Sequence, residues 1–256
     1  MARIDRYAYT SRIRFIDPAQ KAELAALVIL ICLTLPHPAV GCVAVLWMGT
    51  LTVWWGGIPL PVMVRVLLAE GLFLLFAVVG VVLSFSWEPP PASFWGVQIG
   101  PLWISTHPGA LALAGLLVSR AYGSVSAMNF LALTTPFIDI VDLLRRLRVS
   151  PILIDLMDVM YRFVFVLLDS MERIYTAQQS RLGYATRRTA MRSSGLLASR
   201  LFLDAYQRSQ RMQTALESRG YYGNLRVLPL TYRHDRWAYI WTVAVVVSLL
   251  LAGMRT

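Results

Sequence analysis

Two short arginine-containing segments repeat in the longest polar stretch of the sequence. They run over residues 177–183 and 215–220, and each contains a Ser-Arg pair beside glycine. Arginine presents five N–H donors in a planar fork, which fits a carboxylate or the carbonyl oxygens that end a helix. Small neighbouring residues let the backbone approach another surface closely. The segments therefore predict two docking points, whose residues are Ser180, Arg181, Leu182, Gly183, Ser218, Arg219 and Gly220.

The same residues are also compatible with two ordinary helix C-termini. Arginine is favourable near the negative end of the helix dipole, and glycine often caps the last turn. The context favours docking, because both copies lie within residues 176–223, the one long polar region of an otherwise apolar chain.

Composition assigns the chain to the integral membrane proteins. Hydrophobic residues make up 57% of the 256 residues, charged residues only 15%, and the net charge is +10. Arginine accounts for 23 of the 24 basic residues. These arginines flank apolar segments without a recognisable nucleic-acid motif, so the charge indicates membrane topology and a partner surface.

The apolar segments predict an all-α membrane protein of about five transmembrane helices with a cytoplasmic helical coupling region. The expected crossings are residues 22–35, 39–55, 62–87, 109–134 and 237–253, and residues 88–107 are expected to form a loop. Residues 135–236 hold 16 arginines against 9 acidic residues. The positive-inside rule then places this region and the N-terminus in the cytoplasm and the C-terminus outside. The expected domains are residues 1–134, 135–236 and 237–256.

The cytoplasmic region is expected to contain three helices. The first begins at Thr135 and Pro136 and is ended by Ser150-Pro151, which opens the second. Residues 151–175 place their charges on one stripe, which favours a helix that lies at or under the membrane without crossing it. Residues 187–195 are expected to form a flexible basic connector, and residues 196–217 an amphipathic helix that ends in the second arginine segment.

Polar residues also interrupt the apolar segments. Glu70 must find a partner inside the helical bundle, and a hydrogen-bonded packing contact is the favoured interpretation over a functional site. Arg120 and Asn129 are expected to bond within the protein. A ridge of small residues at every fourth position of the fourth crossing predicts close helix packing; its members are Gly115, Ser119, Gly123 and Ala127.

The two arginine segments, on a helical region between a four-span block and a final span, resemble the T component of energy-coupling factor transporters. The opening Ile4-Asp5-Arg6-Tyr7-Ala8-Tyr9-Thr10, followed by Asp17-Pro18 and Lys21, is similar to the cobalt branch of that family, the Q subunit. The second segment differs from the family's Ala-Arg-Gly pattern only by Ser218. The first has Ser180 for alanine and Leu182 for glycine, with Gly183 next.

This resemblance implies a non-catalytic scaffold in a bacterial inner membrane. Its expected partners are two ATP-binding-cassette ATPases, a substrate-binding M-type membrane subunit and a small N-type subunit. No cofactor is expected in this chain, because ATP and magnesium would be bound by the ATPases and the metal substrate by a partner subunit. The residues agree, since the sequence contains no GxxxxGK[ST] phosphate loop and no ligand-spaced cluster of its His and Cys. Cobalt as substrate follows from the family branch alone.

Two other classes remain open. A polytopic membrane enzyme could use Glu70, Arg120 and the cytoplasmic acids, although no HExxH motif or nucleophile elbow is present. A stand-alone secondary transporter would be expected to have internal repeats of its spans, which five unequal segments do not provide.

Overall fold

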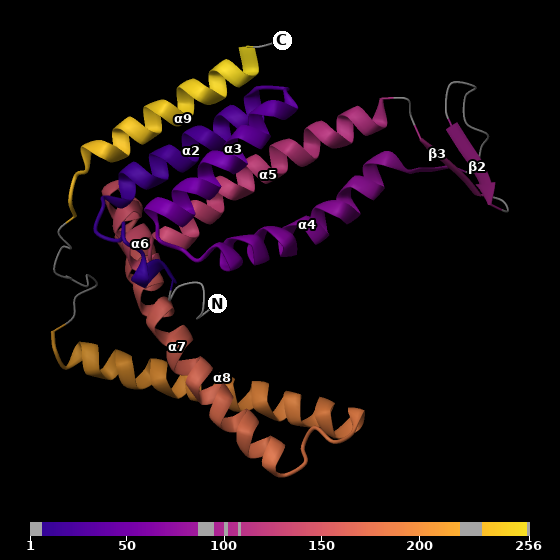
Figure 1. The fold of residues 1–256 in the computed structure, drawn as a ribbon. Coiled ribbons are helices and arrows are strands. Elements are labelled where there is room, and N and C mark those ends of the chain that lie inside the picture. Colours follow the sequence, from indigo (N-terminus) through magenta and orange to yellow (C-terminus); the bar gives the residue numbers. More distant parts are fainter. Residues whose placement is uncertain (1–6, 87–94, 100–101, 107–108, 221–231, 255–256) are drawn as a thin grey trace. The chain divides into compact units, whose positions relative to one another are not determined.

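The chain divides into two compact units. The computed structural model describes residues 7–86, 95–99, 102–106, 109–220 and 232–254 (Figure 1). The first unit comprises Arg3–Pro136 and Thr231–Thr256, and the second comprises Phe137–Leu230.

Five long helices of the first unit pack as a bundle. They are α2 (Pro18–Thr34), α3 (Pro38–Thr50), α4 (Leu60–Val82), α5 (Ala110–Thr134) and α9 (Arg236–Met254), and a π-helical stretch, η1 (Leu51–Trp55), continues α3. Helix α5 contacts α2, α3 and α4, and α9 contacts α2 and α3. Val28, Met48, Phe130 and Val245 are fully buried where these helices meet. The all-α fold class predicted from the apolar segments is confirmed.

Four of these helices are long and apolar enough to cross a membrane. They are Pro38–Trp55, Leu60–Val82, Ala110–Thr134 and Arg236–Met254. Helix α2, the first of the five expected crossings, has only 17 residues, about 25 Å of helix against a hydrocarbon core of about 30 Å. It also carries Lys21 and Glu23 in its first turns. The four helices are those of a multi-pass membrane protein. Helix α2 begins four residues before the expected segment 22–35 and is still shorter than a full span.

One end of the bundle joins segments that are distant in sequence. Lys21 Nζ donates to the carbonyl oxygen of Thr134 at 3.2 Å, and Arg233 N donates to Phe15 O at 2.8 Å. The start of α2, the end of α5 and the start of α9 therefore lie together. As a result, the chain leaves the bundle after α5 and returns to it before α9 at the same end.

The small-residue ridge of α5 packs on α3 over part of its length. Ser119 Oγ donates to Pro38 O, and a side-chain carbon added at Gly41 would collide with the backbone of Ser119. A Cβ at Gly123 would lie 3.0 Å from Gly41 Cα, whereas nothing lies within 4 Å of one at Gly115. The predicted close packing is thus present, and Gly115 takes no part in it.

A small antiparallel sheet follows α4. Its strands are β1 (Ser84–Ser86), β2 (Trp95–Ile99) and β3 (Leu102–Thr106), in the order β1-β3-β2. Two sequence expectations are therefore wrong: the segment 88–107 is not all loop, and the preceding helix ends at Val82 rather than extending to residue 87. Aromatic and β-branched residues favour strands at β2 and β3. The loop was predicted because prolines lie next to these residues in the sequence.

The second unit consists of α6 (Phe137–Arg146), α7 (Pro151–Ser180) and α8 (Arg187–Glu217). Arg145 pairs with Asp158 at 3.3 Å and joins α6 to α7. The expected flexible connector over residues 187–195 is wrong, because α8 already begins at Arg187. Thr186 and Thr189 form a capping box there: each side chain bonds the backbone N–H of the other, at 3.3 and 3.0 Å. Residues 221–223, whose Tyr-Tyr-Gly sequence predicts a turn, lie outside the described residues.

Candidate docking site

The first arginine segment ends α7 through a residue in the left-handed conformation. Leu182 has φ 56°. Its N–H bonds to Gln179 O at 3.0 Å, and the N–H of Gly183 bonds to Gln178 O at 2.9 Å. These two bonds satisfy carbonyls that a helix end otherwise leaves unpaired. Arg181 is thereby fixed at the last position before the chain turns away from the helix axis.

The second arginine segment ends α8 in the same way. Gly220 has φ 73°, and its N–H bonds to Glu217 O at 3.0 Å. Relative to the arginine, Gly220 occupies the position that Leu182 occupies in the first segment. The left-handed conformation is uncommon outside glycine. Because the residue after the arginine adopts it in both segments, the two segments form the same kind of helix end.

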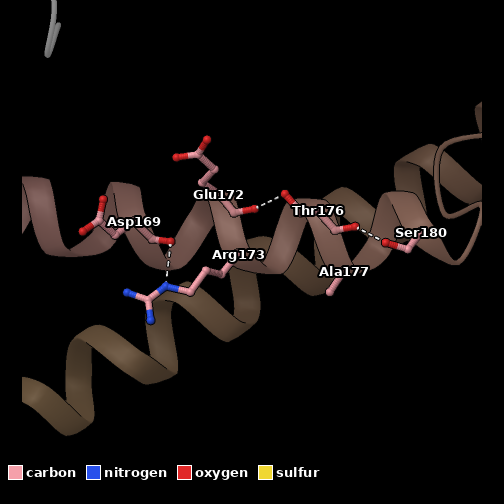
Figure 2. A pocket seen from close by; sticks show the side chains of 6 residues that line it. All are labelled: Asp169, Glu172, Arg173, Thr176, Ala177 and Ser180. Carbon is pink, nitrogen blue, oxygen red and sulfur yellow. Dashed lines mark hydrogen bonds between the residues drawn. The ribbon is translucent and has the colours of Figure 1, made fainter.

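The serine before each arginine is bonded to its own helix. Ser180 Oγ donates to Thr176 O, and Ser218 Oγ donates to Thr214 O, both at 2.8 Å. Figure 2 shows the first of these bonds. Each threonine lies four residues before its serine, so the repeated motif is Thr-Ala-x-x-Ser-Arg. The two threonines were not among the predicted docking residues, although both copies in the sequence have this spacing.

The two arginines remain available to a partner. Arg181 and Arg219 are exposed. Neither guanidinium forms a hydrogen bond or salt bridge with any residue that the structure describes. Since the serine hydroxyls are already used within the helices, the arginine forks are the principal free donors of each tip.

The turn after α7 is held by a small hydrogen-bonded network. Gln178 Nε2 donates to Ser193 O at 3.1 Å, Tyr184 OH donates to Gln178 Oε1 at 2.8 Å, and Ser193 Oγ donates to Gly183 O at 2.9 Å. These bonds tie the first tip to the start of α8. The tip is therefore held in one conformation by its own hydrogen bonds, and pre-organisation of this kind lowers the entropy cost of binding in general.

Helices α7 and α8 are also bonded to each other farther from the turn. Asp204 Oδ2 accepts from Ser170 Oγ and from Arg208 Nε, both at 3.0 Å. The hydrogen bonds from Arg208 and Ser170 lower the pKa of Asp204 below its ordinary value. From this contact α7 continues for about 15 Å and α8 for about 20 Å before they end. The contact thus sets the relative direction of the two tips.

The face of α7 that leads to the first tip carries two exposed carboxylates. Asp169 and Glu172 line a shallow depression of about 480 Å³ with Ser180 at its far end (Figure 2). Arg173 does not neutralise these carboxylates, because its guanidinium points away from them (Figure 2) and its Nε donates to the backbone oxygen of Asp169 at 3.3 Å. This face of α7 therefore carries two carboxylates against one guanidinium.

Two of the polar residues that interrupt the apolar segments, Glu70 and Asn129, contact each other. Asn129 Nδ2 donates to both carboxylate oxygens of Glu70, at 2.9 and 3.1 Å, which joins α5 to α4. The packing interpretation of Glu70 is thereby supported. Arg120 Nε is buried, and no hydrogen-bond partner for it occurs among the described residues, so the expected internal bond of Arg120 is not found there.

Within the described ranges, no three His, Cys, Asp or Glu side chains are grouped to hold a metal ion. His37 Nδ1 instead accepts from Ala39 N at the start of α3. Cys32 is buried, whereas Cys42 is exposed.

Comparison with known proteins identifies the family of the chain. The family model described as "CbiQ: Cobalt transport protein" matches residues 12–229. A cobalt transport protein CbiQ of Salmonella typhimurium is 30% identical over 89% of this chain and 100% of its own length. The energy-coupling factor transporter transmembrane protein EcfT of Staphylococcus aureus is 29% identical over 55% of this chain and 56% of that protein.

A further relative is named as a fused protein. The putative fused cobalt transport protein CbiMQ of Methanocorpusculum labreanum is 30% identical over 61% of this chain, which covers 27% of that protein. Because the family match spans most of the sequence and a full-length relative shares the same extent, the chain belongs to the CbiQ family of cobalt transport proteins, the cobalt-type transmembrane components of energy-coupling factor transporters.

Proposed function

We propose that the chain is the scaffold through which two ATP-binding-cassette ATPases drive a separate substrate-binding subunit, and that the cargo is the cobalt ion. One observation carries the proposal: both arginine segments end long helices with the same backbone conformation and leave an exposed, unpaired guanidinium among the described residues. Each arginine is proposed to insert into a groove on one ATPase and pair with a carboxylate or with backbone carbonyls.

The proposed coupling follows from how the tips are attached. The turn network and the Asp204 contact hold α7 and α8 as a hairpin. A displacement applied at one tip is then transmitted along a helix rather than absorbed in a loop. ATPase closure is proposed to move both tips together and to shift a substrate-binding subunit held by the transmembrane helices. The fused relative supports an M-type subunit as that partner.

The docking role is tested with Arg181→Ala, Arg219→Ala and the double variant in the complete transporter. Truncating one partner of a buried interfacial charge pair costs about 2–5 kcal/mol, so each single variant should lose ATPase during purification. Because two linked contacts share the binding, the double variant should lose more than either single one. Lysine at either position should restore only part of the binding, since it keeps the charge and loses the fork.

Arg162→Ala is the matched control, because Arg162 is an exposed arginine of α7 far from its end. Membrane insertion and elution on gel filtration should be unchanged in all variants. Normal assembly and normal cobalt uptake by the double variant would show that the segments are ordinary helix ends. Uptake of radioactive cobalt with nickel as competitor tests the cargo.

A further inference from the structure

A groove runs from the first tip along the interface between α7 and α8. Its volume is about 780 Å³, and it begins at Arg181, Leu182 and Gly183. On α8 it continues along one stripe of that helix, from Thr189 to Gln207. The groove belongs wholly to the second unit, and a protein seated on the first tip would cover its opening.

The groove carries an uncompensated positive charge. Arg181, Arg192 and Arg200 line it, and none of the three guanidiniums has a hydrogen bond or ion pair to another described residue. Its acidic lining residue, Asp204, already accepts from Arg208 and from Ser170. The carboxylate of Asp204 is therefore already paired with Arg208 and does not balance the other arginines. Arg181, Arg192 and Arg200 remain to attract a negatively charged ligand.

Apolar side chains alternate with these arginines. Leu196 and Leu203 line the groove and are 53% and 46% exposed. Arg192, Leu196 and Arg200 follow one another at intervals of four residues, so they lie on one face of α8. The two arginines are about 12 Å apart along the axis. The stripe is thus complementary to a segment that carries two carboxylates about two helical turns apart with apolar residues between them.

We propose that this groove binds an acidic, amphipathic segment of the same ATPase that docks on the first tip. The inference rests on the proposed docking function and adds a partner chemistry and two residues, Arg192 and Arg200, to it. Carboxylates of the segment pair with the two arginines, while its apolar side chains cover Leu196 and Leu203. A protein segment is favoured over a phospholipid headgroup because the groove opens directly at Arg181, the residue that the ATPase is proposed to cover.

The test uses the full chain with its ATPases and compares two double charge reversals. In Arg192→Glu/Arg200→Glu, ATPase affinity should fall about tenfold or more, because two attractive pairs become repulsive. Arg162→Glu/Arg187→Glu changes the net charge equally at two exposed arginines that do not line this groove, and its affinity should stay within about twofold of the wild type. Lysine at residues 192 and 200 should retain most of the binding.

The outcomes separate this inference from the docking proposal. If Arg181→Ala weakens ATPase binding and Arg192→Glu/Arg200→Glu does not, docking at the tip stands and the groove inference is wrong. If Arg181→Ala/Arg219→Ala also binds normally, the docking proposal itself fails. If the groove variant keeps its ATPases but no longer binds phosphatidylglycerol vesicles, the groove is a lipid site and the inference is overturned. Gel filtration of each variant verifies that the chain is folded.

Discussion

At the scale of single residues, the two tips differ mainly in what occupies the left-handed position. The left-handed position is occupied by Leu182 in the first tip and by Gly220 in the second, with φ values of 56° and 73°. A side chain in this conformation contacts its own backbone unfavourably, which costs about 1–2 kcal/mol per residue. Leu182 is 74% exposed, so packing of its side chain against the rest of the protein offsets little of this conformational cost.

We expect Leu182→Gly to stabilise the hairpin of α7 and α8 by about 0.5–1 kcal/mol, after allowing for the larger backbone entropy of glycine in the unfolded chain. The reverse change, Gly220→Leu, should destabilise the end of α8 by about 1 kcal/mol. Hydrogen exchange of the amides in the last turn of each helix measures both effects. Faster exchange near residue 182 in Leu182→Gly would contradict the strain argument.

At the scale of elements, the hairpin depends on one carboxylate. Asp204 accepts from a residue of each helix, and these hydrogen bonds lower its pKa. This contact was not predicted from the sequence. The spacing of Asp204 and Arg208 allowed an i, i+4 pair, but the partner Ser170 is 34 residues away and only the packing of α7 on α8 brings it close.

The lowered pKa of Asp204 predicts the sign of a pH effect. The carboxylate contributes stability above the pKa of Asp in an unfolded chain, about 3.9. That contribution is lost as the pH falls through the lower folded value. Contact between α7 and α8, followed by a spin-label distance between the helices, should be unchanged from pH 7 to about pH 5 and loosen below about pH 4.

Asp204→Asn should remove this transition and loosen the contact at neutral pH. Asp169→Asn is the matched control, because Asp169 is an exposed aspartate of α7 on the face shown in Figure 2. A wild-type transition that persists in Asp204→Asn would assign the pH effect to another group.

Helix packing in the bundle depends on a second close contact, between α3 and α5. Gly41→Ala would place a carbon against the backbone of Ser119, and overpacking of this kind costs about 1–3 kcal/mol. Gly49→Ala on the same helix has nothing within 4 Å of the new carbon and should be neutral or slightly stabilising. Thermal unfolding in detergent should separate the two variants, and equal melting temperatures would show that the helices yield without cost.

At the scale of the whole molecule, the bundle favours five crossings, although among the described residues only four helices are both long and apolar enough to span a membrane. Ser11 Oγ donates to Gly56 O at 3.0 Å. The end of η1 therefore lies at the same end of the bundle as the starts of α2 and α9. Helix α2 therefore leads away from this end and α3 returns to it. If α2 did not cross, residues 135–236 would lie opposite the basic N-terminal arm, against the positive-inside rule.

We expect the N-terminal arm and the region between α5 and α9 to lie in the cytoplasm. Reporter fusions after Thr134 and after Ala177 should report the same side, because α7 carries charges too costly to bury in lipid. Met191 is 83% exposed, so Met191→Cys in a chain lacking Cys32 and Cys42 should react with an impermeant maleimide in inverted vesicles. Labelling in intact cells instead would reverse the topology.

The sequence by itself determined the features that depend on local composition and periodicity. Long apolar runs predict the four spanning helices, and the repeated Ser-Arg pairs with their glycines predict two helix ends, because these signals lie within a few turns of one segment. Prediction from the sequence was wrong where two local signals favoured different structures for the same residues. The serines and Gly195 suggested a connector, whereas the capping threonines begin α8 at Arg187.

Only the tertiary structure decided how distant residues combine. The bond of Asp204 to Ser170 and the bond of Gln178 to Ser193 join residues that are 34 and 15 positions apart. The arginine-lined groove also combines residues of α7 and α8. The closeness of Gly41 to Ser119 likewise depends on how α3 packs on α5. Such contacts depend on helix length, crossing direction and rotation, which periodicity within a single helix does not specify.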